Sequence, residues 1–467
     1  MKKFYFSMVA MMLVAAMTAS AAEDFWYNGI AYKIIGTDSV EVTRPTGDYT
    51  SLGGAIVFPE TVYNNNKSYT VAAIGESAFW KCKTITSVSI PKTVTSIGYR
   101  SFYDCTNLSS VTFENAAQSH LKVIGGISFS ETAITTITIP ESVKEIYSAF
   151  ENCTNLTTAN LPSSMDYLGS MVFYGCTSLK TVRIPSGIDT IKEASFRDCT
   201  SLTSITIPSN ITKIEGTAFY GTGLTSITIP SSVTTIGTAA FGRCYGLTTV
   251  TIPSTATSIG YRVFTECTGL TSVNIQNNMI AARQFEGCTN LKTVNIGRNV
   301  TEIYTTSFES CPIETLNVSS NCAADIQYFS SAKPTLKTLT LTDGVTDLPE
   351  NAFVDCSVLE TVTLPRGLKS IGNSAFQNCT RMYDLIAKMP RPFAVDASVF
   401  SGVQQHGYCD LHVPQGSKFR YEAMEVWKEF TAITEDGGPG VKRGDVNADG
   451  SVDIADVVTV LNIMAGQ

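Results

Sequence analysis

The residues with the most recognisable chemistry lie near the end of the chain, in the stretch Asp-Val-Asn-Ala-Asp-Gly-Ser-Val-Asp-Ile-Ala-Asp of residues 445–456. Oxygen-bearing residues recur there at the intervals of a calcium loop, and Gly450 stands where such a loop turns sharply. A hard divalent cation requires oxygen ligands at this spacing. The sequence therefore predicts a bound calcium ion. The predicted ligands are Asp445, Asn447, Asp449, Ser451 through its carbonyl, Asp453 through water, and Asp456. The simpler alternative is an acidic turn that binds no metal.

Most of the remaining chain is built from one repeated unit, which is clearest in residues 199–219. An Ala-Phe or similar pair marks each copy, and the commonest distance between marker phenylalanines is 23 residues. Self-similarity at a period of about 20–50 residues is typical of stacked repeat proteins. The marker phenylalanines are Phe79, Phe102, Phe129, Phe150, Phe173, Phe196, Phe219, Phe241, Phe264, Phe285, Phe308, Phe329, Phe353, Phe376 and Phe400.

The positions within a repeat have distinct roles. In residues 202–207, Ile205 and Ile207 alternate with polar residues, which is the period of a half-buried strand. Pro208 ends this run because proline cannot donate a hydrogen bond to a sheet. Gly216 permits a tight bend before the marker phenylalanine. One coil cannot enclose its own apolar side chains, so we expect stacked coils to bury them in a continuous core.

The Leu-x-x-Ile-x-Ile pattern resembles the leucine-rich repeat, and the added proline and the Ala-Phe-x-x-Cys segment resemble the subclass found in BspA-type bacterial surface proteins. The resemblance covers about residues 74–400. It implies a repeat solenoid with a parallel β-sheet on one face. It also implies a role in adhesion, because known members of that family engage host matrix proteins or other cells.

The calcium loop follows a Gly-rich linker and ends in aspartate, and in this it resembles one half of a dockerin, the calcium module that binds cohesins. Dockerins carry two such loops, whereas this sequence has one. Two positions that carry hydroxylated recognition residues in many dockerins are Ile454 and Ala455 here. The resemblance implies docking to a cohesin-like module or pairing with a second dockerin-like module; a terminal tag is the remaining alternative.

The cysteines follow the repeat. The sequence holds 13, and all but Cys322 and Cys409 lie three residues after a marker phenylalanine. Thr132, Thr222 and Ala332 occupy the same position in other repeats, so the position selects a small, buried side chain. This pattern favours a column of free thiols. Disulfides between neighbouring coils are the alternative, because stacking brings equivalent positions close together.

The outward strand positions form two columns of mostly hydroxyl and amide side chains. These columns offer hydrogen-bonding groups to a protein strand or a glycan, although threonine also suits any exposed sheet surface. Ice binding is a minor further interpretation of a regular threonine array. The predicted partner-binding residues are Thr138, Arg183, Thr206, Thr228, Thr251, Asn274, Asn295, Asn317, Thr340 and Thr363.

Aromatic residues lie directly after four marker phenylalanines, at Trp80, Tyr103, Tyr174 and Tyr220. A row of exposed rings would form an edge on which sugars stack. The other interpretation is that these rings cover the phenylalanine column, which is the commoner role for aromatic side chains in such positions.

The first residues are predicted to be a secretory signal peptide, with Lys2 and Lys3 before an apolar core and a small-residue cleavage site at its end. An uncleaved anchor is the alternative. No other window holds about 18 consecutive apolar residues, so no membrane span is predicted. The net charge of −8 and the absence of basic clusters argue against a nucleic-acid partner. We expect a secreted or cell-surface protein.

The ends of the chain depart from the repeat and are expected to cap it. Strands are predicted at residues 25–35, 40–43, 55–58 and 68–74, and an amphipathic helix is predicted from Ser417 to Phe430 with Phe419 and Trp427 on its inner face. The predicted organisation is a signal peptide at 1–21, a β-rich N-terminal cap at 22–75, a leucine-rich repeat solenoid at 76–400, a helical C-terminal cap at 401–434, a linker at 435–444 and a dockerin-like half module at 445–467.

The sequence contains no nucleophile elbow, no His-Glu-x-x-His motif and no phosphate-binding loop, and its three histidines are scattered. We therefore predict a non-enzymatic binding or adhesion protein whose partner is an extracellular protein or a glycan. The alternative is an accessory component of a polysaccharide-degrading surface complex, attached through the calcium module. An enzyme with an unrecognised site is the least favoured interpretation.

Overall fold

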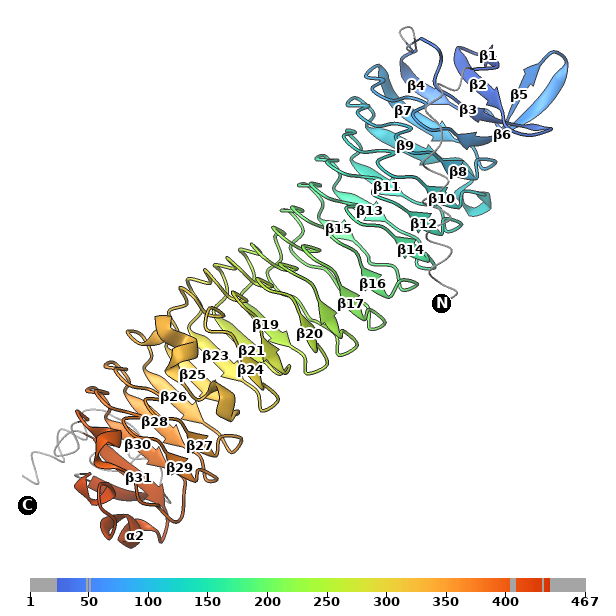
Figure 1. The fold of residues 1–467 in the computed structure, drawn as a ribbon. Coiled ribbons are helices and arrows are strands. Elements are labelled where there is room, and N and C mark those ends of the chain that lie inside the picture. The colour runs from blue at the N-terminus through green and yellow to red at the C-terminus, as the bar shows by residue number, and fades with distance from the viewer. Residues whose placement is uncertain (1–22, 48, 50–51, 404–408, 431, 437–467) are drawn as a thin grey trace, which may run out of the picture. The chain divides into compact units, whose positions relative to one another are not determined.

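The structure is a computed structural model that describes residues 23–47, 49, 52–403, 409–430 and 432–436 (Figure 1). The chain divides into two compact units, Met1–Asn210 and Ile211–Gln467. Each unit is built mostly from parallel strands with little helix, and this confirms the predicted repeat solenoid. The predicted signal peptide lies outside the described residues.

In unit 1, each coil contributes one strand to each of two faces. The outward columns lie on the first face, whose parallel strands pair in the orders β4-β7-β9 and β11-β13-β15. These strands are β4 (Gly54–Val57), β7 (Ile85–Ile90), β9 (Ser110–Phe113), β11 (Thr136–Thr138), β13 (Thr158–Asn160) and β15 (Thr181–Val182). The second face holds β6 (Lys67–Ile74), β8 (Ser96–Ile97), β10 (Val123–Ile124), β12 (Glu145–Ile146), β14 (Tyr167–Leu168) and β16 (Thr190–Ile191).

In unit 2, the first face is one long parallel sheet. Its strands are β19 (Thr249–Ile252), β21 (Ser272–Ile275), β23 (Thr293–Ile296), β25 (Thr315–Val318), β26 (Thr338–Leu341), β28 (Thr361–Leu364), β30 (Asp384–Ala387), β31 (Asp410–Pro414) and β32 (Ala432–Asp436). The second face holds β17 (Lys213–Ile214), β18 (Thr235–Ile236), β20 (Ser258–Ile259), β22 (Met279–Ile280), β24 (Glu302–Ile303), β27 (Asp347–Leu348) and β29 (Ser370–Ile371). Unit 2 also contains the short 3-10 helices η2 (Asn321–Ala323), η3 (Ile326–Ala332) and η4 (Ala397–Phe400), and unit 1 contains η1 (Ala116–Gln118).

The core is a column of phenylalanine rings. The marker rings are buried, and within each unit most of them stack on the ring of the next coil, with centroids 5.3 Å apart for Phe79 and Phe102 in unit 1 and 5.2 Å apart for Phe285 and Phe308 in unit 2. An aromatic pair contributes about 0.5–1.5 kcal/mol beyond the burial of its area. The predicted inward position of the phenylalanines is therefore confirmed.

A column of thiols runs beside the rings. All 13 cysteines are free, and all but Cys322 are buried. The thiol of Cys105 donates to the carbonyl oxygen of Phe79 in the preceding coil at 3.0 Å, and Cys199 donates to Phe173 at 3.1 Å. The prediction of free structural thiols is confirmed. The cysteine position thus satisfies a buried backbone acceptor as well as filling space.

The turn around each marker phenylalanine requires left-handed backbone. Asp104 has a φ of 58°, Asp198 60°, Asp355 62° and Asn378 61°, and each of these residues directly precedes the buried cysteine of its coil. Asp, Asn and Gly tolerate this region better than other residues. The acidic residues that recur before the cysteines therefore serve the turn geometry.

The N-terminal cap differs from its prediction in three respects. Residues 25–35 form two antiparallel strands, β1 (Phe25–Tyr27) and β2 (Ile30–Ile34), because Asn28 and Gly29 have positive φ and close a tight hairpin. The remaining cap strands are β3 (Ser39–Val42) and an unpredicted β5 (Thr61–Asn64), which pairs with β6. Both β4 and β6 pair in parallel with strands of the first repeats, so the cap supplies strands to the solenoid.

The C-terminal cap also differs. The predicted helix over 417–430 is wrong: a short α2 (Lys418–Glu422) is followed by a residue with positive φ, Val426, and then by η5 (Trp427–Glu429). This break places the buried Trp427 ring edge-on against Phe400. Phe419, predicted to face inward, is 63% exposed. Strand β32 extends through Asp436, where the linker was predicted to begin.

Replacement of one marker ring tests the core. Phe196 is fully buried and its ring lies 5.8 Å from that of Phe173. We expect Phe196→Ala to lower the free energy of unfolding by about 3–5 kcal/mol, because large-to-small core substitutions lose both burial and packing. Denaturant titration measures the change. Thr206→Ala, at an exposed position in the next coil, should change the free energy of unfolding by no more than about 0.5 kcal/mol. An equal effect of the two substitutions would contradict the inward position of Phe196.

Candidate functional site

The predicted partner-binding residues follow the outward face of each unit, but their exposure changes along the chain. The exposed members are Thr138, Arg183 and Thr206 in unit 1 and Thr228, Thr251 and Asn274 in unit 2; Asn295, Asn317 and Thr340 are half-buried. The prediction that Thr363 is available to a partner is wrong, because this side chain is only 8% exposed. Its partner in the next strand is Ile386, whose larger side chain stands where earlier coils carry threonine or asparagine.

Four of these residues are joined into a single chain of hydrogen bonds, which we call the amide ladder: Thr251, Asn274, Asn295 and Asn317. The side-chain amide of Asn274 donates to Thr251 Oγ1 at 3.3 Å, that of Asn295 donates to Asn274 Oδ1 at 2.6 Å, and that of Asn317 donates to Asn295 Oδ1 at 2.7 Å. The ladder forms because these residues are direct register partners in β19, β21, β23 and β25.

The ladder orders its side chains without exhausting their hydrogen-bonding capacity. An asparagine side chain offers two N–H donors and two acceptor lone pairs. Each internal member of the ladder uses one donor and one lone pair along the column. The arrangement therefore presents uncharged donors and acceptors at the strand spacing of about 4.8 Å. Groups of this kind bind by hydrogen bonding and do not act as acids or bases near neutral pH.

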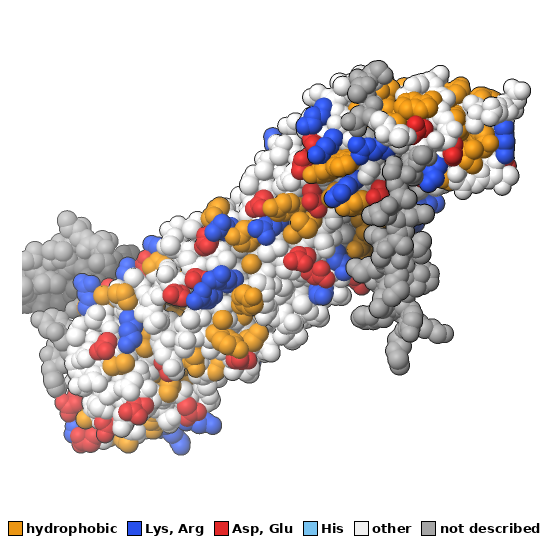
Figure 2. All heavy atoms as spheres, turned by 45° about the horizontal axis from the view of Figure 1, so that its top comes forward, with side chains coloured by type: hydrophobic (Ala, Val, Ile, Leu, Met, Phe, Trp, Pro, Cys, Tyr) orange, Lys and Arg blue, Asp and Glu red, His pale blue; other side chains and the backbone are white. Residues whose placement is uncertain are grey.

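A charged row borders the ladder, one residue before the strands begin. The Lys292 ammonium lies 2.8 Å from the Glu314 carboxylate, and the Lys337 ammonium lies 2.9 Å from it on the other side. The hydrogen bonds from these two lysines lower the pKa of Glu314 to about 2. Figure 2 shows acidic and basic side chains interspersed on the visible surface, among uncharged groups.

The charged row yields a pH-dependent expectation. The lowered pKa means that the stabilisation from Glu314 is present above the ordinary glutamate pKa of about 4.3 and is lost as the pH falls toward 2. We expect Lys292→Gln to raise the pKa of Glu314 toward the ordinary value, because one of its two donors is removed. NMR titration of the Glu314 carboxyl carbon measures this. Lys180→Gln, in unit 1, is the control and should leave the titration unchanged.

The aromatic residues beside the phenylalanine column are half-buried, and each has a cation over its ring. Arg44 lies over Trp80 at 4.7 Å from the ring centroid, and Arg243 lies over Tyr220 at 5.6 Å. The same pairing joins Arg100 with Tyr103 and Arg197 with Tyr174. Neither predicted role, an open sugar-stacking edge or a simple cover, included these cations. A cation in this position contributes about 0.5–1 kcal/mol at an exposed site.

One histidine has a defined environment. His412 Nδ1 lies 2.9 Å from Thr434 Oγ1, and His412 Nε2 lies 3.5 Å from Asp384 Oδ1, so this side chain links the neighbouring strands β30, β31 and β32. This agrees with a structural role. Among the described residues, no group of three or more histidine, cysteine or acidic side chains could hold a metal ion. The predicted calcium ligands, in residues 445–456, lie outside this part of the chain, so the calcium site stays a prediction.

The repeats match a known family model. The model of the BspA type leucine rich repeat region matches six overlapping segments that together extend from residue 72 to residue 403. The chain belongs to the BspA-type leucine-rich repeat family. The cysteine position, the left-handed turn before it and the outward columns described above are thus features of BspA-type coils in this chain.

Solved structures similar to this BspA-type chain come from several bacteria. A leucine-rich repeat protein from Bacteroides ovatus ATCC 8483 is 27% identical, with a TM-score of 0.55, and the match covers 78% of this chain and 94% of that one. A leucine rich cell surface protein from Faecalibacterium prausnitzii A2-165 is 23% identical over 94% of this chain and 99% of that one, with a TM-score of 0.42. No curated protein matches the chain.

No helix in the described part of the chain is both long enough and apolar enough to cross a membrane.

Proposed function

We propose that this protein is an exported, non-enzymatic adhesion protein that binds an extracellular protein or a glycan through the outward sheet face of unit 2. The amide ladder carries this proposal. Its side chains are uncharged, held in fixed register by strand pairing, and still able to offer donors and acceptors to a partner. The family supports a binding scaffold of the bacterial cell-surface type.

The surroundings of the ladder favour specific contact over non-specific charge attraction. At the border of the face, Glu314 offsets one of the two positive charges of Lys292 and Lys337, so this row keeps a net charge of only +1 and contributes little long-range field. From β19 to β26 the columns themselves consist of threonine, serine and asparagine. A partner that matches hydrogen bonds at the strand spacing would therefore be selected by geometry.

An array experiment tests this role. The mature protein is applied to a combined array of glycans and extracellular-matrix proteins, beside the variant Asn295→Ala. This variant removes the middle of the amide ladder. We expect it to bind at least tenfold more weakly to any array ligand that captures the wild-type protein. The matched control is Asn299→Ala, because Asn299 is an exposed asparagine of the same coil whose amide donates to Gln276 outside the ladder.

The array outcome decides the proposal. Capture lost in Asn295→Ala but kept in Asn299→Ala assigns binding to the ladder. Equal capture by both variants would move the binding surface elsewhere on the solenoid. Absence of any ligand on the array would remove the support for an adhesin.

A second candidate function is that of an accessory component in a polysaccharide-degrading surface complex, attached through residues 445–467. The spacing of Asp445, Asn447 and Asp449 before Gly450 favours it, because that spacing is the one a calcium loop needs. The partner would be a cohesin-like module or a second dockerin-like module.

Calcium binding tests the second candidate on the full chain. We expect calorimetry to show one calcium ion bound per chain, and Asp449→Ala to abolish the binding heat because it removes a direct ligand. Calcium-dependent capture of a cohesin module would support attachment, and chelation should release it. A chain that gives no binding heat with calcium would exclude both the site and the attachment.

A further inference from the structure

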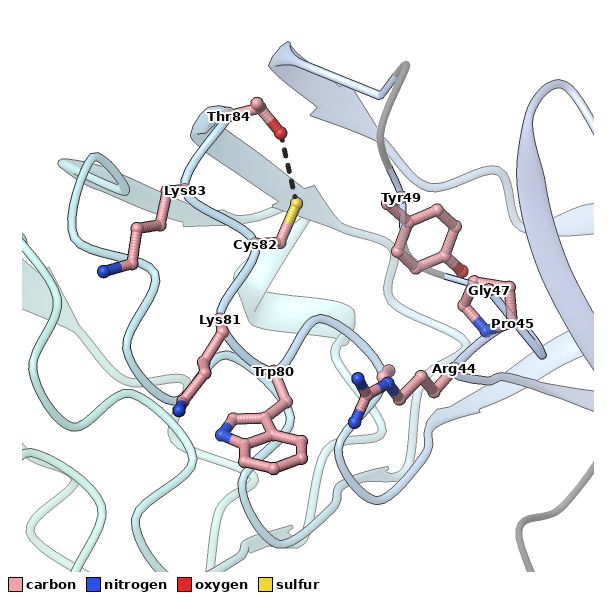
Figure 3. Close-up of a pocket in the computed structure, with 10 residues that line it drawn as sticks. Arg44, Pro45, Gly47, Tyr49, Trp80, Lys81, Cys82, Lys83 and Thr84 are labelled. Carbon is pink, nitrogen blue, oxygen red and sulfur yellow. Dashed lines mark hydrogen bonds between the residues drawn. The ribbon is translucent and has the colours of Figure 1, made fainter.

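Unit 1 contains a pocket of about 350 Å³ between the loop that follows β3 and the first repeat coil (Figure 3). Figure 3 shows Pro45 and Tyr49 on the side of the loop and Lys81 and Cys82 on the side of the coil. Sequence reasoning missed this pocket, because its two sides are about 35 residues apart along the chain. Part of the loop around Tyr49 lies outside the described residues, so we assign no ligand to the pocket.

The outward face of unit 2 is described along its whole length from β19 to β26, and there it forms two straight columns of side chains, which we call the polar track. The first column is the amide ladder, continued by Thr340, the register partner of Asn317. The second column is formed by the register partners Thr249, Ser272, Thr293, Thr315 and Thr338. Positions along a column are one strand spacing apart, about 4.8 Å, and the two columns are about 6.4–6.8 Å apart.

The polar track has defined ends. In the strand after β26, Thr363 is only 8% exposed, and its own partner in the following strand is Ile386. On the other side, the strand pairing of this sheet begins at β19. The track therefore extends over five successive strands, β19, β21, β23, β25 and β26.

The period of the polar track argues against an extended peptide as its partner. A peptide strand rises about 3.2–3.4 Å per residue, so its groups on one side recur at about 6.4–6.8 Å. Laid along the track, these groups would move out of step with the ladder by roughly 2 Å at each coil, which a hydrogen bond does not tolerate. Laid along one strand, the peptide would contact a single coil and leave the ladder unused.

The composition of the polar track argues against a folded protein surface. Protein interfaces are usually anchored by a few tryptophan, tyrosine or arginine side chains in well-packed pockets. Both columns consist of threonine, serine and asparagine, so none of their side chains is aromatic or charged. The track offers many equivalent hydrogen-bonding groups and no such anchor.

We propose that the polar track binds a neutral, linear polysaccharide of β-linked sugar units, which lies across the strands with one sugar on each coil. This inference rests on the proposed binding role of the amide ladder and names the class of its partner. An extended chain of this kind advances by nearly one strand spacing per sugar, so it stays in step with the coils. Charged sugars are less favoured, because the uncharged track has no ion to pair with a charge that loses its water.

The hydrogen-bonding capacity of the track matches such a chain. Every sugar hydroxyl can donate one hydrogen bond and accept others. Asn295 uses one N–H donor toward Asn274 and one lone pair toward Asn317, and an asparagine side chain has a second donor and further lone pairs. The threonine or serine of the second column adds a hydroxyl on the other side of each sugar.

The first test is the dependence of affinity on chain length, measured by calorimetric titration of the full chain. The probes are β-1,4-linked oligomers of glucose, xylose or mannose with two to six sugar units. Each added sugar brings contacts without a separate association step, so affinity should rise until the track is filled. We expect at least a tenfold rise from two to five units and less than a twofold rise from five to six. Maltose oligomers, which are α-linked and wind, should bind at least tenfold more weakly.

Variants tie this binding to the ladder. Asn295→Ala should weaken binding of the five-unit oligomer at least tenfold, because it removes the middle of the ladder. Asn299→Ala is the matched control and should keep wild-type affinity, since the Asn299 amide donates to Gln276 outside the ladder. Thermal melts establish that both variants are folded.

The outcomes separate this inference from the proposed adhesion function. The polysaccharide is excluded if none of the three β-linked series binds, if affinity does not change with length, or if maltose oligomers bind equally well. Array capture of a matrix protein that is lost in Asn295→Ala would then keep the adhesion function with a protein partner. Sedimentation that shows a dimer, dissociated by Asn295→Ala, would instead assign the ladder to a second copy of this chain and overturn the inference.

Discussion

The stacking of one coil on the next is the interaction on which the rest of this structure depends. A single coil has too few apolar side chains to exclude water, so its ring and its aliphatic residues become a core only when neighbouring coils cover them. The same stacking aligns the backbone for parallel strand pairing and brings most of the thiols, such as those of Cys105 and Cys199, to the phenylalanine carbonyl of the preceding coil. The left-handed residue before each cysteine allows the turn that makes this alignment possible.

Register explains why a surface of uncharged side chains can have a defined structure. In unit 2 the parallel pairing places Asn274, Asn295 and Asn317 at the same height on adjacent strands. Their amides then bond to one another, which restricts rotamers that would be free on an isolated strand. Order of this kind lowers the entropy lost on binding. The charged row beside the ladder follows from the same register, since Lys292, Glu314 and Lys337 occupy equivalent positions in successive coils.

Much of this could be predicted from the sequence, because the features that repeat are local. The alternation around Ile205 and Ile207 and the 23-residue step are enough to separate inward from outward positions. The features that were missed depend on contacts between distant residues. The predicted helix is interrupted at Val426, and this break allows the Trp427 ring to pack against Phe400. No local sequence pattern predicts a contact between these two distant residues. The pocket beside Tyr49 requires the cap loop and the first coil to meet. Thr363 is buried because its partner in the next strand is Ile386, where earlier coils have threonine or asparagine.

The thiol column has a consequence for the redox chemistry of the chain. Oxidation and disulfide exchange proceed through the thiolate, and burial raises the pKa of Cys356 to about 12 and that of Cys199 further still. These two buried thiols are therefore almost entirely protonated at neutral pH. Cysteine at these two positions therefore fills the core without adding a reactive thiolate to the chain.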